Sequence, residues 1–190
     1  MYLRKATTRE LHRLATITVT SLKDDPVFDF MWRYRHSFPE DTFFFWQQTL
    51  QSWLYDKKKT CIVMVLDEKD NGLDRKEDIL PDTIISYAVW RQPQVYKYGQ
   101  RRENTNAEMR TMHGFPERWL LELMVTHVDF RRRGAATALL KWGIEEADRE
   151  KIPCKVEGSP MGRLLYKSQG FKDLGPFVIK FNSQKESIII

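Results

Sequence analysis

Residues 119–137, WLLELMVTHVDFRRRGAAT, indicate the fold more clearly than any other stretch of the chain. The run from Trp119 to Val125 has the length of a strand and is apolar on both faces, which predicts a central strand of a sheet. A basic turn rich in small residues follows, and a helix is predicted from Gly134 to about Glu150. A buried strand is therefore expected to pass through a tight turn directly into a long helix.

The start of that helix is a candidate anion site. The first amide N–H groups of a helix have no partner within the helix, so a bound phosphate or pyrophosphate completes their hydrogen bonds. The small residues 134–136 would let a ligand approach the backbone, and the arginines 131–133 would add positive charge. From spacing alone, a basic turn that caps a helix and binds nothing is an equal alternative.

The rest of the chain is predicted to supply further strands and helices. Strands are expected at 2–5, 61–66, 83–90, 153–157 and 174–181, and helices after the capping box at 7–10, after Ser37 and at 160–169. Residues 67–82 and 91–118 are expected to be loops, the second of them either functional or disordered. The order predicts a single mixed α/β domain over residues 1–190.

Composition argues against several classes of protein. The 190 residues are 42% hydrophobic and 13% aromatic, which is typical of a folding chain. The longest apolar runs are shorter than the roughly 18 residues that span a bilayer, and the N-terminus lacks the apolar core of a signal peptide. Cys61 and Cys154 are far apart and lie in predicted strands, which indicates buried thiols without a disulfide framework. We therefore expect a cytoplasmic protein that does not bind membranes.

The net charge of +5 is compatible with a polyanionic partner. The basic runs Lys57–Lys59 and Arg101–Arg102 are most simply solvated surface. The sequence has no recognisable nucleic-acid-binding motif, so nucleic acid is not expected as a partner. A non-catalytic module that binds CoA or nucleic acid stays open as an alternative.

Arg131-x-x-Gly134-x-Ala136 resembles the (Gln/Arg)-x-x-Gly-x-(Gly/Ala) signature of the GNAT superfamily of N-acetyltransferases. LELMVTH at 121–127 is similar to the family's central strand, and SPMGRLLYKSQGF at 159–171 to its closing motif. The similarity covers about residues 60–181 and is greatest to fungal-type members, although Val128 stands where members often have proline. It implies the GNAT fold, an α/β (α+β) architecture with a mixed, mostly antiparallel central sheet of about 6–7 strands flanked by helices.

The resemblance also implies that the chain uses acetyl-CoA and no metal. Backbone groups at the end of the central strand would pair with the pantetheine arm, the amides of the turn would hold the pyrophosphate, and a serine would contact the cofactor arm. The cofactor-binding residues expected on this basis are Met124, Val125, Thr126, Arg131, Arg132, Arg133, Gly134, Ala135, Ala136, Thr137 and Ser159.

Two residues are predicted to be catalytic. Tyr166 matches the tyrosine that several members use to protonate the departing CoA sulfur, and its alternative role is packing. Glu122 is the one carboxylate in an otherwise apolar strand, where an unpaired carboxylate is costly to bury. It is predicted to be the general base and to share a face with Leu120 and Met124, with an ammonium anchor and a structural ion pair as alternatives.

The acceptor is predicted to be a small-molecule amine. The first helices are rich in aromatic residues between Phe28 and Trp46, most of them expected in the core and a minority lining an acceptor pocket. Tyr96 and Tyr98 could close over that pocket. A protein-lysine acetyltransferase with an open peptide groove is the main alternative, and the chain is expected to be a monomer or a homodimer.

Overall fold

The computed structural model of the protein describes residues 1–67, 70, 82–93, 118–175, 178–180 and 187–189. Within these residues the main sheet has five strands in the order β1-β2-β3-β4-β5. The first four strands run antiparallel to their neighbours, and β5 runs parallel to β4. The strands are β1 (Tyr2–Lys5), β2 (Lys59–Val65), β3 (Ile84–Arg91), β4 (Trp119–Thr126) and β5 (Cys154–Val156).

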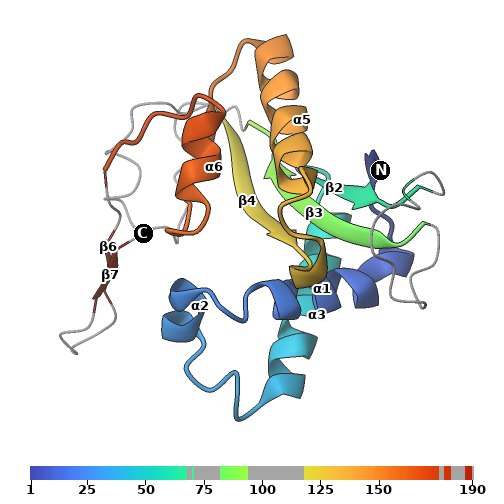
Figure 1. Ribbon diagram of the computed structural model, residues 1–190, viewed down its shortest axis with the longest axis vertical. Helices are drawn as coiled ribbons and strands as arrows, with labels where there is room; N and C mark the ends of the chain where they lie inside the picture. Colours follow the sequence, from blue (N-terminus) through green and yellow to red (C-terminus); the bar gives the residue numbers. More distant parts are fainter. Residues whose placement is uncertain (68–69, 71–81, 94–117, 176–177, 181–186, 190) are drawn as a thin grey trace, which may run out of the picture.

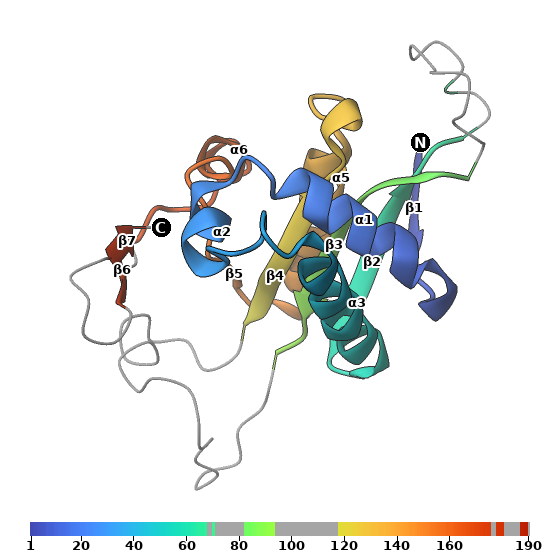
Figure 2. The same ribbon diagram turned by 90° about the horizontal axis from the view of Figure 1, so that it is seen from below.

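Helices cover both faces of this sheet (Figures 1 and 2). The helices α1 and α3 pack on one face, and α5 packs on the other with α6 beside it. The short helix α2 lies close to α6 in both views. The helical elements are η1 (Thr8–Glu10), α1 (Leu11–Ser21), α2 (Pro26–Met31), α3 (Pro39–Tyr55), η3 (Val128–Phe130), α5 (Ala135–Glu150) and α6 (Arg163–Ser168).

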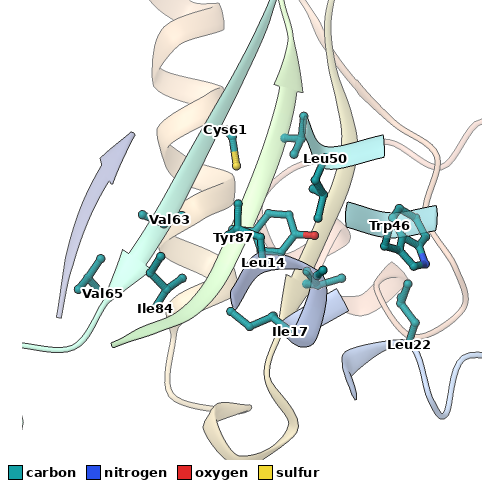
Figure 3. Close-up of a cluster of buried hydrophobic side chains, with 13 residues drawn as sticks. Leu14, Ile17, Leu22, Trp46, Leu50, Cys61, Val63, Val65, Ile84 and Tyr87 are labelled. Atoms are coloured by element: carbon teal, nitrogen blue, oxygen red, sulfur yellow. The ribbon is translucent and has the colours of Figure 1, made fainter. Parts of the chain in front are cut away.

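The face toward α1 and α3 holds one of two apolar clusters. Leu14 and Ile17 of α1 and Leu50 of α3 lie around Tyr87 of β3, all of them fully buried (Figure 3). Each fully buried aliphatic side chain contributes roughly 1.5–3 kcal/mol to folding. The Tyr87 hydroxyl is paired with Thr18 of α1, so this polar group is buried with a partner.

The opposite cluster fixes the position of α5. Leu139 and Leu140 of the helix are fully buried against the sheet, next to Trp90 of β3. At Gly143 the helix approaches the sheet closely, because a Cβ atom there would lie 2.1 Å from Cε2 of Trp90. Glycine is therefore required at this point for α5 to pack on β3.

The elements agree with the sequence-based predictions in kind and approximate place, with two differences. The central sheet has five strands in the described residues and not 6–7, because the described C-terminal strands β6 (Val178–Lys180) and β7 (Ser187–Ile189) pair with each other in a separate sheet. The second difference is α2, a short helix that was not predicted, which is capped by Asp25 and has proline in its first turn. Most of the predicted loops 67–82 and 91–118, with Tyr96 and Tyr98, lies outside the described residues. Among the helices that are described, none is long and apolar enough to cross a bilayer.

Candidate functional site

The strands β4 and β5 part after three pairs of residues. Only Trp119–Leu121 of β4 pairs with β5, whereas β4 continues to Thr126. The amide of His127 donates to the Ile85 carbonyl of β3 at 2.9 Å. Because backbone groups alternate in direction along a strand, Val125 also faces β3, and Met124 and Thr126 face the opening beyond the end of β5.

This arrangement divides the three residues predicted to bind the pantetheine arm. The backbone groups of Met124 are directed to the open edge of β4, whereas the backbone groups of Val125 pair with β3. The carbonyl of Thr126 already accepts a hydrogen bond of 2.8 Å from the hydroxyl of Ser21 at the end of α1. The groups best placed to pair with an extended ligand are therefore those of Met124 and the amide of Thr126.

The turn after β4, residues Arg132–Thr137, is called the backbone cradle below. Arg132 and Gly134 both adopt left-handed conformations, with φ of 63° and 83°, and α5 begins at Ala135. Within the described part of the chain, none of the amides from Arg132 to Thr137 donates to another protein group, and no side chain caps the helix. Backbone N–H groups without partners at a helix start are suited to bind anions, and phosphates in particular.

The three arginines of the turn have different surroundings. Arg131 donates from Nη2 to the carbonyl of Ser21 at 2.7 Å, and its Nη1 lies 3.7 Å from Oδ2 of Asp24. The guanidinium of Arg133 lies over the ring of Phe130, 5.4 Å from its centroid, and Arg132 is exposed. Arg131 thus joins the turn to the end of α1, and its predicted contact with a phosphate stays a prediction.

Tyr166 lies in α6 and is closely packed on the loop that precedes this helix. A Cβ atom at Gly158 or Gly162 would lie 2.5 or 2.6 Å from Cε2 of the tyrosine ring, so both positions need glycine. Ser159 lies within the same loop and accepts the amide of Gly162 through its carbonyl at 3.0 Å. Among the described residues, the Tyr166 hydroxyl has no hydrogen-bond partner, and it is therefore available to a ligand.

Burial raises the pKa of Tyr166 to about 12, and the negative charge of Asp25 adds to this shift. Asp25 is only 5% exposed and accepts the amide of Val27 at 2.9 Å as the cap of α2. The sequence signal for Asp25 was an acidic residue before a proline, which predicts a helix cap. Its electrostatic contact with a residue 141 positions later is visible only in the structure.

Glu122 occupies a β-bulge in the central strand. Val89 of β3 lies opposite Leu123 and Trp90 lies opposite Leu121, so Glu122 has no residue facing it. Met124 packs with the apolar cluster on the α5 side, whereas the Glu122 carboxylate meets cations on the α3 side. The expectation that Glu122 and Met124 share a face is therefore wrong, because the extra residue of the bulge reverses the alternation.

The Glu122 carboxylate is shared by two cations. It pairs with the ammonium of Lys59, and Nε of Arg91 lies 3.1 Å from its Oε1. The side chains of Lys59, Glu122 and Arg91 are 13%, 14% and 28% exposed. The Lys59 ammonium also lies 4.4 Å from the ring centre of Trp53 in α3. Of the alternatives for Glu122, the ion pair is present in the structure, and the role of general base stays a prediction.

Comparison with known proteins gives one relative in sequence and many in structure. No family model matches the chain. A curated protein from Stachybotrys chartarum named Acetyltransferase is 24% identical over 196 residues, which cover 91% of this chain and 81% of that protein. Among solved structures, a "histone acetyltransferase HPA2 and related acetyltransferase" from Corynebacterium glutamicum has a TM-score of 0.63 at 19% identity. The match covers 98% of this chain and 92% of the Corynebacterium chain.

The chain has the GNAT fold of solved acetyltransferases, and a relative in sequence that is named Acetyltransferase spans nearly the whole chain. A second solved GNAT structure, the aminoglycoside N-acetyltransferase AAC(6')-Iy in complex with CoA, has a TM-score of 0.55 at 12% identity and covers 96% of this chain and 95% of its own. The likeness at these identities establishes the GNAT fold, and the chemistry of this member has to be argued from its own residues.

Proposed function

We propose that this protein belongs to the GNAT superfamily and is an acetyl-CoA-dependent N-acetyltransferase that acts within a single domain on the amine of a small molecule. The observation that carries the proposal is the backbone cradle at Arg132–Thr137, whose amides are free of protein partners in the described residues. It lies at one end of the opening between β4 and β5, beside the edge of β4 that has no strand partner among the described residues.

The residues present fit the two parts of CoA that a GNAT fold has to hold. The cradle offers amides and nearby arginine charge to a pyrophosphate. The edge of β4 at Met124 and Thr126 offers backbone groups to the amides of a pantetheine arm, as an added strand would use them. Ser159 lies in the loop on the other side of the opening, where its side chain has no hydrogen-bond partner in the described residues.

Acetyl-CoA, when bound, supplies a thioester. A neutral amine takes the acetyl group from it, and CoA is released as the thiol. Tyr166 would donate a hydrogen bond to the sulfur as negative charge develops there. With a pKa of about 12, the phenol is a weaker acid than a thiol with a reference pKa near 8.5. The tyrosine therefore stabilises the leaving group mainly by hydrogen bonding. The amine loses its proton to solvent, and the CoA thiolate takes up a proton from solvent to become the thiol.

A small-molecule acceptor is supported by the likeness to an aminoglycoside N-acetyltransferase. The competing class, acetylation of protein lysines, is supported by the likeness to a protein named as a histone acetyltransferase. Both classes would share the cradle and Tyr166. They differ in the acceptor, so an acceptor assay separates them.

The proposal is tested in two steps with the full chain. Titration calorimetry with acetyl-CoA tests the cradle. Binding is expected for acetyl-CoA and for 3′-dephospho-CoA, which keeps the pyrophosphate, and no binding is expected for pantetheine, which lacks it. Release of free thiol is then followed with a panel of small amines and with lysine-containing peptides. Absence of acetyl-CoA binding contradicts the proposal as a whole, and turnover with peptides alone replaces the small-molecule acceptor with a protein one.

A further inference from the structure

The ion cluster of Lys59, Glu122 and Arg91 lies at the end of the opening that is far from the cradle. β5 pairs with β4 up to Leu121, and Glu122 is the next residue along β4. Met124, whose backbone faces the opening, is two residues further, or about 7 Å along the strand. A ligand that extends from the cradle along β4 therefore ends where this cluster begins, and the acceptor has to meet it there.

The cluster carries more positive than negative charge. One carboxylate faces two cations, all three of them at least two-thirds buried. The Lys59 ammonium is engaged by both the carboxylate and the ring of Trp53. Arg91 contacts the carboxylate through Nε, and in the described residues its two Nη groups have no protein partner.

The free side of Arg91 is suited to a second carboxylate. Its guanidinium presents N–H donors in a planar fork that binds a carboxylate through two parallel hydrogen bonds. Such a partner would also balance the surplus positive charge, which is costly in a partly buried place. An acceptor with several positive charges would meet repulsion at the same point.

We propose that the acceptor is an amine that also carries a carboxylate, and that Arg91 binds this carboxylate with Lys59 adding charge. The inference rests on the proposed acetyltransfer function, whose acceptor it specifies. It favours the structural ion pair among the roles considered for Glu122, because the carboxylate orients two cations and acts neither as the general base nor as an anchor for the substrate ammonium.

The test compares acceptors that differ only in the carboxylate. L-phenylalanine is paired with phenethylamine, and L-lysine with cadaverine, and kcat/KM is measured for each by thiol release. For the wild-type protein, kcat/KM is expected to be about 10-fold or more higher for the carboxylate member of each pair. A hydrogen bond between two charged groups usually contributes binding free energy on this scale. Arg91→Met is expected to reduce this ratio to about 1, and Arg91→Lys to an intermediate value.

Arg149→Met removes an arginine from an exposed pair on α5 and serves as the matched control, with an unchanged ratio expected. Equal use of both members by the wild-type protein, or a preference that persists in Arg91→Met, overturns the inference. If acetyl-CoA binds but no amine is acetylated, the proposed function fails. Binding of N-acetyl-phenylalanine against N-acetyl-phenethylamine, measured by calorimetry in the presence of CoA, then tests the role of Arg91 independently of turnover.

Discussion

The two ends of the opening between β4 and β5 are built from different parts of the chain. At the end proposed for the cofactor, the main feature is backbone, namely the amides of the turn and of the start of α5, which have no partner among the described residues. At the end proposed for the acceptor, the main feature is side chains, with Lys59, Arg91 and Glu122 contributed by three different strands. One end is local in sequence, and the other is assembled by the sheet.

This difference has a consequence for specificity. A backbone cradle recognises a phosphate through geometry that many sequences can provide, so it suits a cofactor shared by a whole superfamily. A cluster of side chains depends on the identity of each member, so it can vary between relatives and select the acceptor. Substitutions at the two ends are therefore expected to affect different measured quantities.

The largest effect is expected from Glu122→Gln, which breaks the acceptor-side cluster. The change leaves two cations, Lys59 and Arg91, without a counter-charge in a mostly buried place, and we expect a loss of about 3 kcal/mol in the free energy of unfolding. For a chain of this size the loss corresponds to roughly 6–12 °C in Tm, measurable by calorimetry.

The matched control is Glu146→Gln on α5, which removes the carboxylate of the exposed pair with Arg149 and should change stability by less than about 1 kcal/mol. A normal Tm for Glu122→Gln with a rate that recovers at higher pH would instead identify Glu122 as a general base.

Tyr166→Phe is expected to lower kcat by about 100-fold, because one hydrogen bond to the charge that develops in the transition state contributes on this scale. The Kd for acetyl-CoA should stay within about threefold, since the cradle is unchanged. Because the pKa of Tyr166 is about 12, the phenol stays protonated through neutral pH, and the wild-type rate should show no decline from this group below about pH 11. Tyr55→Phe, at an exposed tyrosine, is the control, and equal rates for the two variants would remove Tyr166 from the mechanism.

Gly134→Ala tests the cofactor end alone. A Cβ atom at Gly134 meets no neighbour within 4 Å, so the substitution acts through the left-handed backbone, which costs a non-glycine residue about 1–2 kcal/mol. We expect the Kd for acetyl-CoA to rise by about tenfold if the turn relaxes away from the cradle conformation. Gly175→Ala carries the same kind of strain outside the cradle and should leave the Kd unchanged. Equal affinity in both variants would show that the turn does not hold the cofactor.

The smallest effect is expected from Asp25→Asn, which keeps a capping side chain for α2 and removes a negative charge near Tyr166. The pKa of Tyr166 should fall, because the carboxylate charge raises it in the folded protein, and kcat should change by less than about threefold. The tyrosine pKa is measured by NMR titration with labelled tyrosine, using Tyr166→Phe to assign the signal. Asp24→Asn, at an exposed carboxylate, should leave that pKa unchanged.

Most of the fold was predictable because its signals are local. The apolar run of β4, the basic turn with Gly134 and the start of α5 are contiguous, and their periodicity and turn chemistry do not depend on distant residues. The extra pairing of β6 with β7 was not predictable, because short apolar strands do not specify which strand they join. The bulge at Glu122 was missed for a similar reason, since it arises from the register between β3 and β4.

The sequence by itself determined the strand, the turn and the helix start that offer backbone amides to a phosphate, because these conformations follow from residues close together in the chain. Only the tertiary structure decided the partners of the charged groups. Lys59, Arg91 and Glu122 are separated by 32 and 31 residues, and Asp25 and Tyr166 by 141. Charges at such separations meet only when strand order and helix packing bring them together, so the partners of these groups cannot be read from the sequence.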